Sequence, residues 1–168
     1  MTVLGYVKIP LPFSPVPITG QTFGVMLAGA LLGSRLGFLA LLVFDLTGLV
    51  FPVFAGGTGG LGVIVGPTGG YILSWPLAAW LIGYLTEQAP RPGFFRIFTA
   101  NVLGGIVVIY ALGVTQLALV AHIGFLPAFL KGALPFIPGD LIKCAAAAIV
   151  AERLSAYHLV PRQAGAGS

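Results

Sequence analysis

The stretch "IFTANVLGGIVVIYALGVTQLALVA", from Ile97 to Ala121, decides the fold class of this chain. It runs for 25 residues without a formally charged side chain. About 20 consecutive apolar residues in a helix are enough to cross a hydrocarbon core about 30 Å thick. Apolar residues follow one another here instead of alternating with polar ones, which favours a helix over a barrel strand. The stretch therefore predicts a membrane-spanning helix.

The composition of the whole chain has the same character. Of its 168 residues, 58% are hydrophobic and 7% are charged, and the mean hydropathy is +1.05. Soluble domains carry about 25% charged residues. We therefore predict an all-α integral membrane protein, a compact bundle of five to six transmembrane helices in a single membrane domain over residues 1–168. The basic residues behind the net charge of +4 lie mostly at the ends of apolar stretches, so we expect a lipid bilayer as partner and no nucleic acid.

Proline- and glycine-rich stretches separate the apolar ones. "KIPLPFSPVPITG", residues 8–20, holds four prolines and is expected to be an extended outer loop. Residues 52–70 form a glycine-rich outer segment. Helices are expected over residues 21–33, 36–51, 71–85, 97–121 and 140–157, with a short interfacial helix possible within 122–139.

The charges predict which side of the membrane each end faces. Arginines fall on one side of this map (Arg35, Arg91, Arg96, Arg153 and Arg162) and lysines on the other (Lys8, Lys131 and Lys143). The positive-inside rule assigns the arginine side to the cytoplasm. The Pro-rich loop, the Gly-rich segment and "PFIPGD" (135–140) then share the outer face. Irregular backbone at membrane depth is tolerated where it is buried in protein or lines a cavity, so we expect an outward-facing cavity there.

An acid and a base stand three residues apart in "PFIPGDLIKC", residues 135–144. On a helix, Asp140 and Lys143 share one face. A lysine in the first turn is at the unfavourable end of the helix dipole. A helical ion pair returns only about 0.2–0.5 kcal/mol, whereas a lysine in mid-bilayer costs about 2.5–3.5 kcal/mol. We therefore expect Lys143 to contact a ligand, with snorkelling to the surface as the alternative; Asp140 is equally well read as a helix N-cap.

Other polar residues inside the apolar stretches leave more than one interpretation open. Asp45 is either a functional acid, as proton carrier, counter-ion or ligand group, or a protonated acid hydrogen-bonded between helices. Asn101 and Gln116 resemble interhelical hydrogen-bonding residues more than ligand groups. Trp75 and Trp80 could stack on a flat ligand, but packing or interface anchoring is the commoner role.

Enzymatic activity is not expected. No Gly-Lys-Ser/Thr follows the Gly-rich segment, so the chain has no visible ATPase motif. No nucleophile–base set can be argued from the sequence. The single Cys144 excludes a multi-cysteine metal site, and we expect neither a metal nor a cofactor.

Three long motifs carry a resemblance to a known family. They are "IPLPFSPVPITGQTFGVMLAGALLG" (9–33), "FPVFAGGTGGLGVIVGPTGGY" (51–71) and "PFIPGDLIKCAAAA" (135–148). Together they resemble the biotin-specific substrate-binding (S) component, BioY, of energy-coupling factor (ECF) transporters, over residues 9–153. The resemblance implies six helices, an outward-facing biotin pocket and high-affinity biotin uptake across the cell membrane. It also implies partners: a transmembrane coupling protein and two ATPase subunits that supply the energy.

The resemblance also implies where biotin binds. The Asp and Lys of the family's PGD-x-x-K motif, which contact the ligand, correspond to Asp140 and Lys143. With the loops near the first helix and the Gly-rich segment, the expected substrate-binding residues are Asp140, Lys143, Tyr71, Gly56, Gly57, Thr68, Gly69, Phe54, Gln21 and Asn101. A carboxylate can accept from the ureido N–H groups of biotin, and an ammonium can meet an oxygen of the ring or of the acidic tail. The alternatives are specificity for another water-soluble vitamin, or an ion channel or proton-coupled carrier that uses Asp45.

The family has a full first helix, whereas residues 1–7 would reach only about 10 Å as a helix. We therefore expect the first segment to be truncated, with about 15–25 further apolar residues encoded upstream in frame.

Overall fold

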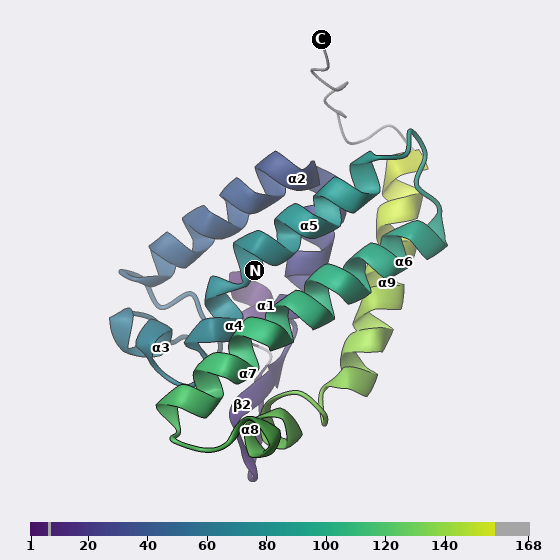
Figure 1. The fold of residues 1–168 in the computed structure, drawn as a ribbon. Helices are drawn as coiled ribbons and strands as arrows, with labels where there is room; N and C mark the ends of the chain where they lie inside the picture. The colour runs from purple at the N-terminus through teal and green to yellow at the C-terminus, as the bar shows by residue number, and fades with distance from the viewer. Residues whose placement is uncertain (7, 157–168) are drawn as a thin grey trace.

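The computed structural model describes residues 1–6 and 8–156. Its longest continuous rod comprises α6 (Phe94–Val102), a π-helical stretch η1 (Leu103–Val108) and α7 (Ile109–Val120). Figure 1 shows α6 and α7 running diagonally as one helix beside α5. The predicted helix over residues 97–121 is confirmed, and it begins three residues earlier. A Cβ at Gly104 would lie 2.5 Å from Ile82 Cγ1, so a glycine there allows the rod and α5 to approach closely.

Helix α2 (Gln21–Gly48) is interrupted at Gly33, whose φ of 81° is a conformation that favours glycine. The carboxylate of Glu87 accepts hydrogen bonds at this break from the backbone N–H of Ser34 (3.0 Å) and from its hydroxyl (2.7 Å). The predicted division into two helices is confirmed, with Gly33 at the break in place of Ser34 and Arg35.

The Pro-rich segment is an antiparallel hairpin of β1 (Lys8–Leu11) and β2 (Ser14–Thr19), in which Lys8 pairs with Thr19. Its extended backbone was predicted, but its pairing was not. Prolines lack an N–H donor and are confined to edge strands. A two-stranded sheet consists of edges alone, so it accommodates them.

The first seventy-odd residues also contain short helices. They are α1 (Thr2–Tyr6) and, around the Gly-rich segment, α3 (Leu61–Val65) and α4 (Gly69–Leu73). The predicted helix over residues 71–85 is divided at Ser74, because α5 (Trp75–Glu87) begins there and takes Pro76 into its first turn. A proline is tolerated in the first turn because the N–H that it lacks would have no helical partner.

The chain continues through α8 (Phe125–Gly132) and α9 (Ile137–Ala156). Helix α8 confirms the short helix considered possible within residues 122–139. Helix α9 begins three residues before Asp140, and its predicted end at Tyr157 lies outside the described residues.

Within residues 1–6 and 8–156, two helices are long and apolar enough to cross a membrane, Gln21–Gly48 and Phe94–Val120. Helices α8 and α9 add a third candidate if they are taken as one span with a bend of 54°. Many large apolar side chains of these helices face outward, as lipid-facing surfaces require, among them Val43, Val107 and Ile142. The predicted all-α membrane bundle is confirmed.

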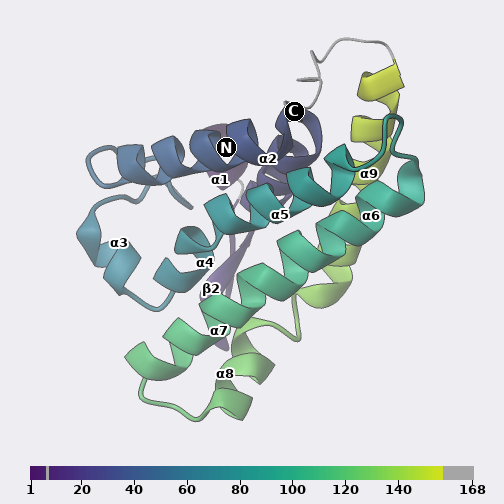
Figure 2. The same ribbon diagram turned by 45° about the horizontal axis from the view of Figure 1, so that its top comes forward.

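The two ends of the bundle differ in character. At one end the break in α2 contacts the end of α5 through Glu87, and the backbone N–H of Phe94 donates to Glu152 on α9 (2.9 Å). Arginines flank these contacts, as the charge map predicts, although Arg162 lies outside the described residues. The hairpin, α3 and α8 lie toward the other end (Figures 1 and 2). The assignment of the arginine end to the cytoplasm stays a prediction.

Candidate binding cavity

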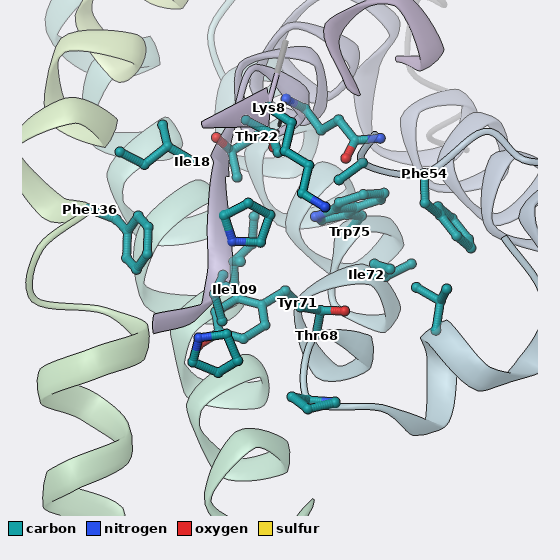
Figure 3. Close-up of a pocket in the computed structure, with 18 of the residues that line it drawn as sticks. Lys8, Ile18, Thr22, Phe54, Thr68, Tyr71, Ile72, Trp75, Ile109 and Phe136 are labelled. Carbon is teal, nitrogen blue, oxygen red and sulfur yellow. Dashed lines mark hydrogen bonds between the residues drawn. The ribbon is translucent and has the colours of Figure 1, made fainter. Parts of the chain in front are cut away.

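A cavity of about 300 Å³ lies at the end that carries the hairpin. All three irregular segments of the predicted outer face contribute to its wall, and α2, α4, α5, α7 and α9 contribute the rest (Figure 3). Its lining is mainly apolar and aromatic, with a few polar groups, and its size is at the lower end of the range for small-molecule sites. The lining residues are Lys8, Pro15, Val16, Pro17, Ile18, Thr19, Gln21, Thr22, Phe54, Ala55, Thr58, Gly62, Val63, Gly66, Pro67, Thr68, Tyr71, Ile72, Trp75, Ile109, Tyr110, Phe136, Asp140 and Lys143.

Lys143 is turned toward the interior at this site. Its ammonium donates to the carbonyl oxygen of Thr19 (2.7 Å), to Thr22 Oγ1 (3.1 Å) and to Asp140 Oδ1 (2.9 Å). An ammonium has three N–H donors, and each has an acceptor here. The snorkelling interpretation is wrong, because the side chain is only 22% exposed and points toward the hairpin and α2.

Asp140 is buried, with 5% of its side chain exposed. Its Oδ1 also accepts from the Thr22 hydroxyl (3.4 Å), and its Oδ2 accepts a short hydrogen bond from the Tyr110 hydroxyl. The N-cap interpretation is wrong, because α9 begins at Ile137 and the carboxylate points away from the first turn toward α2 and α7. Asp140 thus joins three helices that are far apart in sequence.

This network has a clear chemical consequence. An ionised carboxylate offers about four lone-pair sites, and Lys143, Thr22 and Tyr110 occupy three. One acceptor position of Asp140 is left for an N–H group in the cavity. The adjacent ammonium compensates the charge of the carboxylate, which is the condition for keeping an ionised group in an apolar interior.

Aromatic side chains form the rest of the wall. Tyr71 donates its hydroxyl to the carbonyl oxygen of Gly132 (2.9 Å), so α4 is held to α8. Tyr110 meets Tyr71 edge to face, with ring centroids 6.2 Å apart. Phe54 and Trp75 form a second such pair at 6.3 Å. These rings offer flat apolar surfaces to a ligand.

The structure brings together six of the ten residues expected to bind substrate. Those that line the cavity are Asp140, Lys143, Tyr71, Thr68, Phe54 and Gln21. The other four, Gly56, Gly57, Gly69 and Asn101, are not part of its wall. Asn101 donates to the carbonyl oxygen of Cys144 (3.2 Å), which is the interhelical role also considered for it. Ligand contact by any of the ten stays a prediction.

The three glycines have structural roles near the cavity. Gly56 and Gly57 have positive φ of 69° and 71°, which favours glycine in this turn. A Cβ at Gly69 would lie 1.7 Å from the carbonyl oxygen of Ile64, so Gly69 lets α4 begin directly against α3.

Sequence reasoning missed several polar residues of the cavity: Lys8, Thr19, Thr22 and Tyr110. Tyr110 carried a usable signal, since a hydroxyl inside an apolar span needs a partner. Thr19 contributes a backbone carbonyl, which no residue type indicates. Lys8 was placed at the same end of the bundle as the predicted cavity, but its loop gave no indication that its side chain reaches that cavity.

Of three further residues considered from the sequence, Trp75 lines the cavity, and Trp80 and Asp45 do not. Trp75 packs against Phe54 and lines the cavity, whereas Trp80 is 45% exposed and stacks on Tyr84. Asp45 is 7% exposed and does not line the cavity, and its Oδ1 has no hydrogen-bond partner among residues 1–6 and 8–156.

A helical membrane bundle with a partly polar cavity at one end is the architecture of a membrane protein that binds a small solute. Comparison with known proteins identifies the family: a model of the BioY family matches residues 1–159, and the chain belongs to that family. The biotin transporter BioY of Rhizobium etli is 44% identical over 93% of this chain and 87% of its own length. The probable biotin transporter BioY of Pyrococcus horikoshii is 46% identical over 88% and 85%. A crystal structure of the S-component for biotin from an ECF-type ABC transporter superimposes with a TM-score of 0.87 at 32% identity, covering 96% of this chain and 89% of that one.

Proposed function

We propose that this chain binds biotin in the cavity and serves as the biotin-specific substrate-binding component of an ECF-type transporter. The observation that carries the proposal is the network around Asp140, because it leaves an acceptor for an N–H group in a mainly apolar, aromatic-lined cavity. Biotin has the matching chemistry: a flat ureido ring with N–H donors on an apolar body. The relatives of this chain that are named as biotin transporters support biotin as the ligand.

The proposal assigns the chain a transport role without its own catalysis. It places a single multi-pass domain in the cell membrane, with the hairpin and the Gly-rich segment outside. Uptake is then energised by partners, a transmembrane coupling protein and two ATPase subunits. The structure neighbour, an S-component of an ECF-type transporter, supports this assembly.

The test of specificity is titration of the purified protein in detergent with labelled biotin, with other water-soluble vitamins as competitors. We expect displacement by unlabelled biotin and not by the other vitamins. Displacement by a different vitamin alone would contradict the biotin assignment. Uptake of labelled biotin by vesicles, with and without the coupling module and ATP, tests the energy source separately.

A further inference from the structure

Two lysines line the cavity, and they differ in whether their amino groups have partners. All three donors of Lys143 have acceptors, and its charge is compensated by Asp140. The amino group of Lys8 has neither a hydrogen bond nor an ion pair within the part of the chain that the structure describes. Lys8 is exposed to solvent and also lines the cavity, so its ammonium is free to bind an anion that enters there.

The fold holds Lys8 in this position from two sides. Its backbone pairs with Thr19 in the hairpin, so the side chain starts from a fixed strand. Its stem crosses Gly56, where a Cβ would lie 2.8 Å from Lys8 Cδ. Figure 3 shows the Lys8 side chain extending into the cavity toward Trp75.

A second observation points to the same part of the cavity. Trp75 is 4% exposed, and its indole N–H has no acceptor among residues 1–6 and 8–156. A buried donor without an acceptor is unfavourable, and native structures rarely keep one without a reason. A ligand oxygen between Lys8 and Trp75 would supply the missing acceptor.

We propose that Lys8, assisted by the Trp75 indole, binds the carboxylate of the ligand, while Asp140 binds its N–H-bearing ring. This inference rests on the proposed function, because it takes biotin as the ligand. The proposal gives the two lysines different roles. Lys143 neutralises and orients Asp140, and Lys8 binds the carboxylate of the ligand. A solute with a neutral tail would then bind more weakly for a reason that lies in Lys8 alone.

The test compares biotin with biotin amide, whose tail is neutral, on the full chain by calorimetry. We expect the wild type to bind biotin at least about tenfold more tightly than the amide. Lys8→Met keeps the stem and removes the charge, and it should bind both compounds about equally. Lys131→Met is the matched control, since Lys131 is exposed on α8 outside the cavity, and it should keep the wild-type preference.

Lys8→Arg should restore the preference for the acid. Trp75→Phe should weaken biotin and biotin amide alike, because an indole N–H donates to either oxygen. An undiminished preference in Lys8→Met, or no preference in the wild type, would overturn the assignment of Lys8 while biotin binding itself stands. Failure of the wild type to bind either compound would overturn the proposed function and this inference together.

Discussion

The ammonium of Lys143 donates a 2.7 Å hydrogen bond to the carbonyl oxygen of Thr19, 124 positions earlier in the chain. Thr19 ends β2 and pairs with Lys8 on β1. One lysine on α9 therefore fixes the hairpin that carries the other. The Asp140 end and the Lys8 end of the proposed ligand site are thus linked through Thr19. A substitution of Lys143 on α9 should therefore alter the position of the hairpin.

Lys143→Met and Asp140→Asn should each weaken biotin binding at least about tenfold, or about 1.4 kcal/mol. The first removes the cation that compensates the charge of Asp140 and holds its Oδ1. The second replaces one carboxylate oxygen by an amide group that donates. Calorimetry on folded variants measures both affinities, and wild-type values in both would remove the pair from the site.

Stability separates the two roles of this pair. Removing one partner of a buried ion pair leaves an unpaired charge and costs about 3–5 kcal/mol. The double variant Asp140→Asn/Lys143→Met has no charge to leave unpaired, so we expect its thermal unfolding midpoint to recover toward the wild type while biotin binding stays lost. Recovered binding in the double variant would show that the pair serves stability alone.

Tyr110→Phe should weaken biotin binding by about tenfold, because the hydroxyl no longer holds Asp140 Oδ2. A hydrogen bond to a charged group contributes about 1.5–3 kcal/mol, which covers a change of this size. Tyr84→Phe is the control, since Tyr84 is 49% exposed on α5 and does not line the cavity. Equal affinities in the two variants would mean that Tyr110 does not position the carboxylate.

Much of this architecture is predictable from the sequence, because lipid imposes a simple rule. Uncharged stretches long enough to cross hydrocarbon must be helical, so residues 97–121 and the division near Gly33 could be predicted from apolar length and from small or charged residues alone. The same reasoning identified Asp140 and Lys143 as unusual, since charge is costly in that setting.

The contacts between distant segments were not predictable in this way. Nothing in the residue types of the Pro-rich segment indicates that it pairs with itself or that Thr19 meets Lys143. The sequence left an N-cap open as one role for Asp140, but α9 starts at Ile137, and Asp140 has hydrogen-bond partners on other helices. The packing role of Gly69, where a Cβ would lie 1.7 Å from the carbonyl oxygen of Ile64, was not predicted either.

The Gly-rich segment should act as a gate that closes over bound biotin, and the side chain of Gln116 should hold it in place. The amide of Gln116 on α7 donates to the carbonyl oxygens of Ile64 and Gly66, both at 2.8 Å. Gln116→Leu removes both bonds, so we expect α3 to become more mobile and biotin to dissociate faster. A spin label at Leu61→Cys reports on α3, since Leu61 is 67% exposed and the native Cys144 is buried.

In the wild type, biotin should reduce the mobility of this label, and in Gln116→Leu the reduction should be smaller. Gly69→Ala should also impair binding, because its Cβ would clash with the backbone of Ile64. Gly124→Ala is the control, as Gly124 directly precedes α8 outside the cavity and has room for a Cβ. If biotin does not change the mobility of the label, the gate hypothesis is wrong, whereas the proposed binding site is unaffected.

Asp45 should be dispensable for biotin binding, although it is the most unusual acid in the apolar part of the chain. It does not line the cavity, so Asp45→Asn should keep the wild-type affinity within about twofold, since no ligand contact is lost. Its Oδ1 lacks a partner among the described residues, and an unsatisfied buried acceptor costs about 1–3 kcal/mol. Asp45→Leu should therefore raise the thermal unfolding midpoint in detergent. Glu87→Leu should lower that midpoint, because the Glu87 carboxylate accepts hydrogen bonds from the backbone N–H and the hydroxyl of Ser34 at the break in α2. Loss of biotin binding in Asp45→Asn would return Asp45 to the role of a ligand group. A proton flux through the wild type that this variant abolishes would make it a proton carrier.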